Sequence, residues 1–337
     1  MGEVNIAVVG ATGAVGREMV KVLEERNFPV ANLVLLASQK SSGEFLKFNG
    51  KKIEVSELTK NSFKNIDFAL FSAGSSISKK YATHAVTAGA VVIDNSSAFR
   101  MDNQVPLVVP EVNPQDAFKH NGIIANPNCS TIQLVVALKP VYDKAGIKRI
   151  IVSTYQSVSG TGKKAIDELM EQTKAILNKK KIKREVYPHQ IAFNILPQID
   201  EFENNAFTRE EMKMIHETKK IMHDDDIKIT ATAARVPVLY GHSESVYLET
   251  EKIMDIKSLK QIYLKMPGIK LVDDIHNAKY PLAIMSEIYD EVMIGRLRKD
   301  LAVKNGINMW IVANNLRKGA ALNAVQIAEL LLGSQEK

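Results

Sequence analysis

Short apolar runs alternate with amphipathic segments over roughly the first 125 residues of the chain. Residues 4–9 form an apolar run that ends in glycine, which is typical of a buried parallel strand. Residues 13–27 then place apolar side chains at helical spacing and end before a proline. Further strands are predicted at 33–37, 66–73, 90–94 and 123–125, with a helix at 75–89. This β-α-β alternation predicts a Rossmann-type, doubly wound parallel sheet.

The pattern changes after residue 128, where longer apolar runs predict longer strands. These strands are expected at 147–156, 227–238, 245–249 and 307–312, separated by helices at 163–180 and 208–222. Long strands with helices set apart favour a second domain of α+β class. A last apolar helix at 320–332 could pack on either domain, because its periodicity does not choose between them.

Composition agrees with two globular domains. The chain has 337 residues, 45% hydrophobic and 24% charged, which excludes a largely disordered protein and a collagen-like fibre. Its net charge of +6 tolerates an anionic small molecule without requiring nucleic acid. Cys129 is the only cysteine, so an internal disulfide and a cysteine-based metal cage are excluded. No metal site is expected.

The chain carries no evident targeting segment. Its first residues include Glu3 and lack a basic stretch, and no run of about 18 apolar residues follows, so neither a signal peptide nor a membrane span is expected. One basic run, 179–184, lacks interleaved aromatic residues and is interpreted as a solvated helix end or loop. We therefore expect a cytoplasmic protein with no nucleic-acid or membrane partner.

A glycine-rich turn, Gly10-Ala-Thr-Gly13-Ala-Val-Gly16, follows the first predicted strand and opens the first helix. Glycines at this point let the backbone approach a pyrophosphate that lies on the helix N-terminus. The spacing is GxxGxxG rather than GxGxxG, and a turn without a ligand is the alternative. The placement between strand and helix favours dinucleotide binding.

The end of the second strand bears on the choice of cofactor. An enzyme specific for NAD would carry Asp or Glu there, to accept from the ribose hydroxyls. This chain has Ser38, Gln39, Lys40, Ser41 and Ser42, which suit a 2′-phosphate. The segment favours NADP over NAD, with an ordinary polar loop as the alternative.

Cys129 lies between a short strand and an apolar helix at 132–142. The N-terminus of a helix stabilises a thiolate, so Cys129 is a candidate nucleophile, with a buried inert thiol as the alternative. Among the seven histidines, His242 follows a glycine at the end of a predicted strand and lies among polar residues. It is the candidate base, and a structural histidine is the alternative.

Several segments together resemble the aspartate-β-semialdehyde dehydrogenase family. The resemblance rests on Gly10–Gly16, Asn126–Gln133, Phe207–Lys213, Arg235–Ser245, Gly295–Asp300 and Asn315–Ala321, in family order along the whole chain. It implies reversible, NADPH-dependent reduction of L-aspartyl-4-phosphate to L-aspartate 4-semialdehyde and phosphate through a cysteine thioester, which is then reduced to a thiohemiacetal. It also implies a role in the biosynthesis of lysine, threonine, methionine and diaminopimelate.

The resemblance assigns a role to each site residue. Cys129 is expected to be the nucleophile, His242 the acid/base and Gln156 the group that orients the intermediate. The expected substrate contacts are Arg100, Asn128 and Lys213 to phosphate, Arg235 to the α-carboxylate and Glu210 to the ammonium group. The expected cofactor contacts are Gly10, Thr12, Gly13, Ala14, Val15, Gly16, Ser38, Lys40, Ser41, Ser42, Gly160, Asn315 and Gln326. Taken singly, Arg100 and Arg235 could be surface ion-pair partners, Gln156 an exposed strand residue, and Glu210 with Lys213 a surface pair.

The resemblance also implies how the domains are divided. The NADP-binding domain is expected to comprise residues 1–128 plus 316–337, with the last helix returning to it, and residues 129–315 to form a catalytic and dimerisation domain. A homodimer is expected, and some members form tetramers. Lys40 stands where many members carry Arg, which leaves the strictness of NADP preference open.

Two other functions stay as alternatives. N-acetyl-γ-glutamyl-phosphate reductase is related, but its cysteine motif reads Gly-Cys-Tyr where this chain has Asn128-Cys129-Ser130. A catalytically silent cofactor-binding relative is the second alternative, and the presence of both Cys129 and His242 argues against it.

Overall fold

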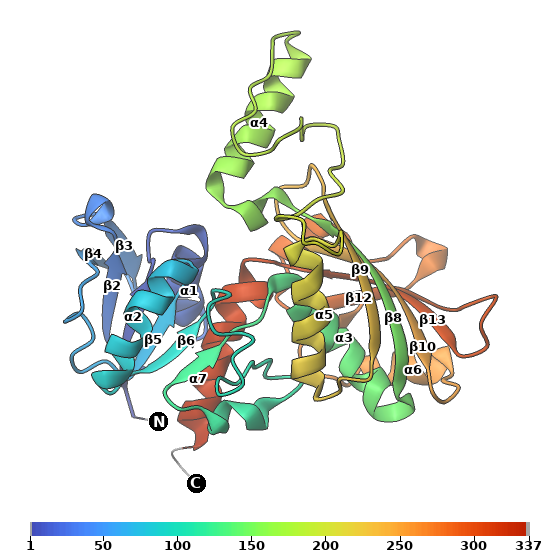
Figure 1. Cartoon of the computed structure of the whole chain (residues 1–337), viewed down its shortest axis with the longest axis horizontal. Helices are drawn as coiled ribbons and strands as arrows, with labels where there is room; N and C mark the ends of the chain where they lie inside the picture. The colour runs from blue at the N-terminus through green and yellow to red at the C-terminus, as the bar shows by residue number, and fades with distance from the viewer. Residues whose placement is uncertain (1, 335–337) are drawn as a thin grey trace. The chain divides into compact units, whose positions relative to one another are not determined.

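The computed structural model describes residues 2–334, which form two compact units, each with its own sheet (Figure 1). Unit 1 is built from residues within 1–128 and 319–337, and unit 2 is residues 129–318. Residues 316–318 therefore belong to unit 2 rather than to the first domain. The cause is local, because the Asn314 side chain accepts from the backbone N–H groups of Leu316 and Arg317, and Arg317 pairs with Asp290.

Unit 1 contains a seven-stranded sheet in the order β3-β4-β2-β1-β5-β6-β7. The strands are β1 (Val4–Val9), β2 (Val30–Ala37), β3 (Phe45–Phe48), β4 (Lys51–Glu57), β5 (Phe68–Phe71), β6 (Val91–Asp94) and β7 (Ile123–Ala125). All neighbours pair in parallel except β3 and β4. The helices are α1 (Ala14–Glu25), α2 (Ser75–Thr87) and α7 (Leu322–Ser334), with short 3-10 turns η1 (Gln39–Ser41) and η2 (Pro114–Lys119).

The two faces of this sheet are covered by different helices. Along β1, Ile6 and Val8 lie in one core cluster with residues of α1 and α7, whereas Ala7 and Val9 lie in a second cluster with residues of α2. Alternate residues of a strand point to opposite faces, so β1 is buried on both sides. The predicted doubly wound, Rossmann-type sheet is confirmed.

The hairpin of β3 and β4 was not predicted from the sequence. Most side chains of β4 are exposed, so the segment lacks the apolar run of a buried strand. Its turn did carry a signal, since Asn49 and Gly50 both have positive φ angles, of 48° and 74°. An Asn-Gly pair of this kind is the strongest short-range sign of a tight hairpin.

Unit 2 contains a six-stranded mixed sheet in the order β11-β12-β13-β10-β8-β9. The strands are β8 (Ile147–Gln156), β9 (Lys228–Arg235), β10 (His242–Thr250), β11 (Ile269–Leu271), β12 (Val292–Lys299) and β13 (Gly306–Ala313). The helices are α3 (Cys129–Ala145), α4 (Lys163–Leu177), α5 (Arg209–Met222) and α6 (Ile256–Tyr263). Shorter helical turns are η3 (Val158–Thr161), η4 (Ile275–Asn277) and η5 (Ala283–Glu287). A π-helical turn, η6 (Arg317–Ala321), begins in unit 2 and ends in unit 1.

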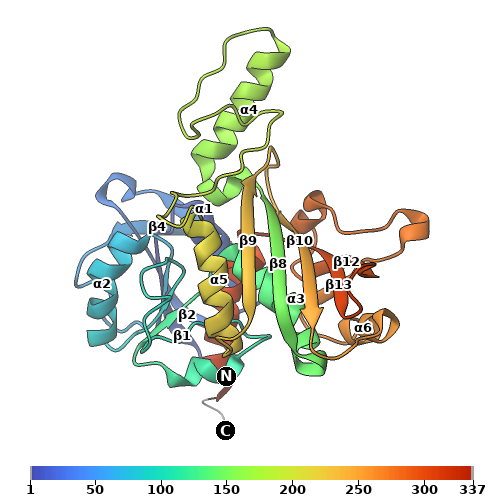
Figure 2. The same cartoon turned by 45° about the vertical axis from the view of Figure 1, so that its right-hand side comes forward.

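One face of the unit 2 sheet packs on helices. Figure 2 shows β9, β8 and β10 in front, with α3 behind them and α5 along β9. Along β8, Ile150 and Val152 are buried, whereas Arg149 and Ile151 on the opposite face are exposed. The α+β class predicted for this domain is confirmed.

Two boundaries in unit 2 differ from the prediction. The strand expected at 227–238 ends at Arg235, and His242 begins β10 instead of following the end of a strand. The helix expected to reach Lys180 ends at Leu177, and Lys179, Lys180 and Lys181 follow it in an exposed loop, as predicted. Among residues 2–334, no helix combines the length and apolar character needed to cross a membrane.

Candidate active site

Four of the predicted site residues lie at one end of the unit 2 sheet. Gln156 ends β8 and pairs in register with Arg235, which ends the parallel strand β9. His242 begins the antiparallel neighbour β10 and pairs with Ala313, two residues before Asn315. Antiparallel pairing brings the start of one strand beside the end of its neighbour, so these four residues lie at the same end of the sheet.

Cys129 is the first residue of α3, where the helix N-terminus favours a thiolate. Its side chain is half-buried. One turn further along α3, the amide of Gln133 donates to the backbone carbonyl of His242 at 3.4 Å. This contact ties the helix that carries the thiol to the strand that carries the imidazole.

Helix α5 brings Glu210 and Lys213 to the same end of the sheet. Its first turn is fixed by a capping box, in which Thr208 and Glu211 each accept from the other's backbone N–H. Glu210 is buried and accepts a hydrogen bond from Gln156 Nε2 at 3.2 Å. Gln156, Glu210 and Lys213 are therefore connected through hydrogen bonds across two elements.

Lys213 lies between two carboxylates. Its Nζ is 2.8 Å from Asp200 and 3.2 Å from Glu210. Burial lowers the pKa of the Lys213 ammonium, but the charges and hydrogen bonds of Glu210 and Asp200 outweigh burial and raise it. The ammonium therefore stays charged at this position, as a contact to phosphate requires.

His242 is completely buried, and its ring contacts the polar residue Ser157. Its Nδ1 faces the backbone N–H of Ser157 at 3.2 Å and the Ser157 hydroxyl at 3.1 Å. Its Nε2 is buried without a hydrogen-bonding partner in the described structure. Burial, and then the positive charge of Arg235, lower the pKa of the imidazole well below 6.5, and a smaller effect of the Gly241 backbone acts in the opposite direction.

Arg235 converges with His242 on Gly160. The guanidinium donates from Nη1 to the Ser157 carbonyl at 2.7 Å, while its buried Nε has no hydrogen-bonding partner in the part of the chain described. A Cβ added to Gly160 would lie 2.9 Å from Arg235 Nη1 and 3.3 Å from His242 Nε2. Because residue 160 has no side chain, no Cβ occupies the space next to these two nitrogens, which could bind an anionic or carbonyl group there.

Arg235 also lines a pocket of about 360 Å³ in unit 2, together with Asp200 and Tyr187. The Arg235 guanidinium and the Asp200 carboxylate, which pairs with Lys213, therefore line the same pocket. Asp200 was not among the predicted site residues. It lies ten residues before Glu210 in an irregular segment, and no local pattern marks it.

The glycine-rich turn of unit 1 fits a dinucleotide phosphate. Gly10 has a φ of +84°, and a Cβ on Gly16 would lie 2.2 Å from the Gly10 carbonyl, so both positions require glycine. Gly13 caps α1 with its backbone alone, because no side chain there accepts from the first N–H groups. Thr12, Ala14 and Val15 complete the turn, which leaves a helix N-terminus open to an anion.

The segment after β2 is exposed and basic. Ser38, Lys40 and Ser42 are exposed and Ser41 is half-buried. The nearby acidic residue Glu44 pairs with Arg17 at 3.0 Å, so its carboxylate already has a cationic partner. The chemistry of this segment suits a 2′-phosphate better than unmodified ribose hydroxyls.

Other predicted residues have contacts of their own. In unit 1, Arg100 is buried and donates to the carbonyls of Asn126 and Asn95, both at 2.9 Å, and Gln326 donates to Glu111 at 3.2 Å. Asn128, also buried, ends that unit's first segment. In unit 2, Asn315 is buried among Ser157, Ser159 and Gly241, which all donate to its Oδ1.

The chain matches known proteins over nearly its whole length. Residues 5–120 match the family model described as semialdehyde dehydrogenase, NAD binding domain, and residues 138–318 match semialdehyde dehydrogenase, dimerisation domain. The aspartate-semialdehyde dehydrogenase of Aquifex aeolicus is 60% identical over 331 residues, 97% of each chain, and that of Bacillus subtilis is 52% identical over 335 residues, also 97% of each.

Solved structures agree. The crystal structure of aspartate semialdehyde dehydrogenase II from Vibrio cholerae, complexed with ASA, has a TM-score of 0.96 at 50% identity and covers 98% of this chain and 99% of that one. The N-terminal unit is thus an NAD(P)-binding domain and the second a dimerisation domain. Sequence, family models and fold agree from end to end, and the chain belongs to the aspartate-semialdehyde dehydrogenase family.

Proposed function

We propose that this protein catalyses the reversible reduction of L-aspartyl-4-phosphate by NADPH to L-aspartate 4-semialdehyde and phosphate. The observation that carries the proposal is the cluster of Gln156, Glu210, Lys213, Arg235 and His242 at one end of the unit 2 sheet. It occurs in a chain 60% identical to an aspartate-semialdehyde dehydrogenase. The cluster contains cationic side chains for the phosphate and carboxylate of an amino-acid phosphate and a carboxylate for its ammonium group.

Cys129 is the nucleophile in this proposal. The thiolate forms a bond to the acyl carbon, the bond from that carbon to the phosphate oxygen breaks, and phosphate leaves with the electron pair. NADPH, when bound, supplies the hydride for the reductive half of the reaction. His242 exchanges a proton with the substrate oxygen at Nε2, the ring atom that has no hydrogen-bonding partner within the described residues.

Substrate recognition is assigned by charge. Arg235 binds the α-carboxylate, which a guanidinium fork suits, and buried Glu210 pairs with the α-ammonium. Gln156 is held by Glu210 and orients the acyl group. Lys213 binds the phosphate, with Arg100 and Asn128 as its further contacts. A free ammonium gives Glu210 a partner that an N-acetylated substrate lacks, which favours aspartyl phosphate over N-acetyl-γ-glutamyl phosphate.

For the cofactor we propose NADP rather than NAD. The turn of Gly10 to Gly16 would hold the pyrophosphate, and Lys40 with its neighbouring serines would bind the 2′-phosphate. Gly160, Asn315 and Gln326 remain proposed cofactor contacts. Gly160 adjoins His242 and Arg235, so this position would bring the cofactor to the reacting groups.

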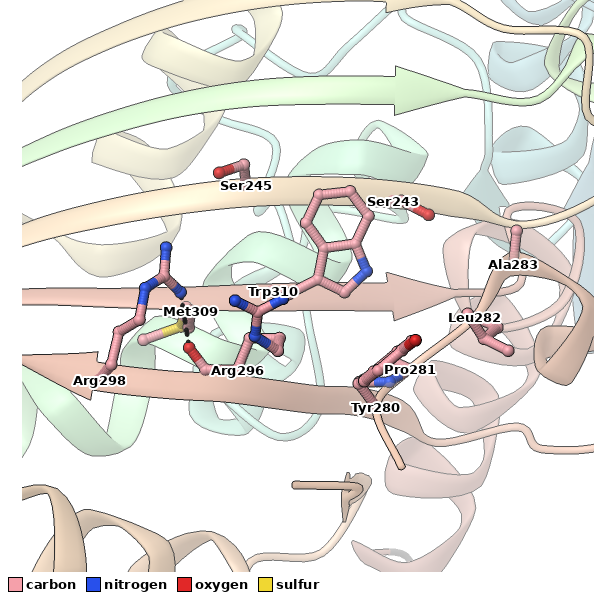
Figure 3. A pocket seen from close by; sticks show the side chains of 10 residues that line it. All are labelled: Ser243, Ser245, Tyr280, Pro281, Leu282, Ala283, Arg296, Arg298, Met309 and Trp310. Carbon is pink, nitrogen blue, oxygen red and sulfur yellow. Dashed lines mark hydrogen bonds between the residues drawn. The ribbon is translucent and has the colours of Figure 1, made fainter. Parts of the chain in front are cut away.

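We also propose that the protein forms a homodimer through the helix-free face of the unit 2 sheet. Ile151 of β8 is 37% exposed on this face. On the same face the rings of Tyr155 and Trp310 pack against each other, with their centroids 5.5 Å apart. Trp310 lines a pocket of about 300 Å³ together with Arg296, Arg298 and Leu282. Figure 3 shows the side chains that line it. An aromatic residue flanked by arginines is typical of the central part of an interface. We propose the cytoplasm as the location.

The test is phosphate-dependent reduction of NADP with aspartate semialdehyde, followed at 340 nm. We expect turnover with aspartate semialdehyde plus phosphate, loss of turnover when phosphate is omitted, and slower turnover with NAD. N-acetylglutamate semialdehyde is the comparison substrate, and equal or faster turnover of it would reject the substrate assignment.

A further inference from the structure

Ser157 presents two different groups to one nitrogen of His242. Its backbone N–H donates to Nδ1 at 3.2 Å, and its Oγ lies 3.1 Å from the same atom. A backbone N–H can only donate, so it pairs with Nδ1 when that nitrogen carries a lone pair. A hydroxyl oxygen can accept, so it pairs with Nδ1 when that nitrogen carries a proton. Both protonation states of Nδ1 therefore have a partner in one residue.

Asn315 determines which way the Ser157 hydroxyl points. Its Oδ1 lies 3.1 Å from the Gly241 backbone N–H, and this donor identifies the atom as the oxygen of the amide. The same Oδ1 lies 3.1 Å from Ser157 Oγ. A carbonyl oxygen cannot donate, so the Ser157 hydroxyl is the donor in this contact. Ser159 Oγ lies 3.0 Å from Ser157 Oγ and can donate to it, so a Ser157 hydroxyl that points toward Asn315 keeps a lone pair for the imidazole.

These groups are shielded from bulk water. Ser157 and His242 are 0% exposed and Asn315 is 3% exposed. The charged side chain that acts on the ring is Arg235 of β9, whose positive charge opposes protonation. On the α3 side, the neutral amide of Gln133 donates to the backbone carbonyl of His242. Along β10, the next residue on the same face is Glu244, and burial raises the pKa of its carboxyl group well above 4.5. Within residues 2–334, no carboxylate hydrogen-bonds to the imidazole.

We propose that Ser157 and Asn315 form a neutral relay that sets the tautomer of His242. In the resting ring Nδ1 accepts from the Ser157 N–H and the proton lies on Nε2. When the ring is protonated it carries a second proton on Nδ1, which donates to Ser157 Oγ, while the Ser157 hydroxyl donates its own hydrogen to Asn315 Oδ1. The imidazolium can then exchange its Nε2 proton with the substrate oxygen and keep the proton on Nδ1. Ser157 is thus a positioning residue, which acts through His242. Only the role of His242 in turnover rests on the proposed function.

Ser157→Ala tests the relay, and Ser159→Ala is the matched control. Ser159 is also buried and contacts Asn315 Oδ1 and Ser157 Oγ, but in the described structure it has no hydrogen bond to His242. The measurement is ¹⁵N NMR of labelled histidine without substrate, with the His242 signals assigned by their loss in His242→Asn. It reports the tautomer and the midpoint of protonation even if the proposed reaction is wrong.

We expect Ser157→Ala to lower the midpoint of His242 protonation by about one pH unit, because the imidazolium loses its acceptor at Nδ1. Ser159→Ala should keep the wild-type midpoint. Asn315→Asp should raise the midpoint, since a carboxylate accepts more strongly from Ser157. In turnover, Ser157→Ala should reduce kcat at least about tenfold and shift its pH profile, while the KM for phosphate stays unchanged. A wild-type midpoint and tautomer in Ser157→Ala would overturn the proposal.

Discussion

Glu244 is a carboxyl group placed where a charge is poorly tolerated. It is completely buried on β10, and neither oxygen has a hydrogen-bonding partner of normal geometry in the described part of the chain. Burial raises the pKa of Glu244 well above 4.5, and the nearby Gln133 amide only partly opposes this. The folded protein therefore holds the Glu244 proton to a higher pH than the unfolded chain does.

Glu244→Gln should make the protein more stable at neutral and alkaline pH. Above pH 4.5 the unfolded chain releases the Glu244 proton while the folded chain keeps it, so wild-type stability falls as pH rises, by up to about 1.4 kcal/mol per pH unit. Glutamine mimics the protonated acid and therefore removes this dependence of stability on pH. Thermal unfolding at pH 4 and pH 8 checks it: the variant should match wild type at pH 4 and exceed it at pH 8.

The control for this experiment is Glu249→Gln on the same strand. Glu249 lies on the opposite face, half-buried, and pairs with Lys148 at 3.1 Å. Its substitution should leave the pH slope of stability almost unchanged. If Glu244→Gln and wild type lose stability equally between pH 4 and pH 8, Glu244 is ionised in the folded protein.

Cys129→Ala should abolish turnover while cofactor binding is retained, because the thiol forms the covalent bond and the glycine-rich turn lies in unit 1. Loss of phosphate-dependent NADP reduction is measured at 340 nm, and NADPH binding by fluorescence titration. Circular dichroism of the variant should match wild type. Substantial residual turnover in Cys129→Ala would contradict the covalent mechanism.

At the level of the element, α5 connects local helix chemistry to the site. Its capping box at Thr208 and Glu211 fixes the first turn, and Glu210 lies in that turn. Thr208→Ala should reduce the free energy of unfolding by about 1 kcal/mol and raise the KM for aspartate semialdehyde through loosened placement of Glu210. Thr208→Ser keeps the capping oxygen and should restore both values. An unchanged KM in the alanine variant would show that the helix cap does not contribute to the placement of Glu210.

Elements buried on both faces were the most predictable from the sequence. Strands β1, β5, β6 and β7 read as apolar runs because helices cover both sides of the sheet they form. Strand β12 was missed, because a register shift between Gly295 and Arg298 interrupts it, and Arg296 there has a φ of 54°. A bulge of this kind breaks the alternation that identifies a strand.

Two candidate site residues, Cys129 and His242, came from their local sequence context, whereas Gln156 and Arg235 were named only through the family resemblance. The register of β8, β9 and β10 brings Gln156, Arg235 and His242 together. Ser157 and Asp200 were missed, since their importance comes from contacts across the sheet and between loop and helix. Such contacts depend on strand pairing, which sequence periodicity does not specify.

At the scale of the whole molecule, Trp310→Arg should convert the proposed dimer into monomers. The substitution places a charge at the centre of the exposed sheet face, beside Arg296 and Arg298 that line the same cavity. Light scattering coupled to size-exclusion chromatography measures the mass. Trp310→Phe keeps an aromatic ring and should remain dimeric. A dimeric Trp310→Arg would place the interface elsewhere.

The return of the chain to unit 1 has a consequence for synthesis on the ribosome. One face of the unit 1 sheet is covered by α7, whose Val325, Ile327 and Ala328 are fully buried in that core. Translation produces all of unit 2 before these residues emerge, so the first domain to be made cannot be the first to be completed. Until then the apolar surface that α7 covers lacks this helix on the nascent chain, and a chaperone can recognise such a surface.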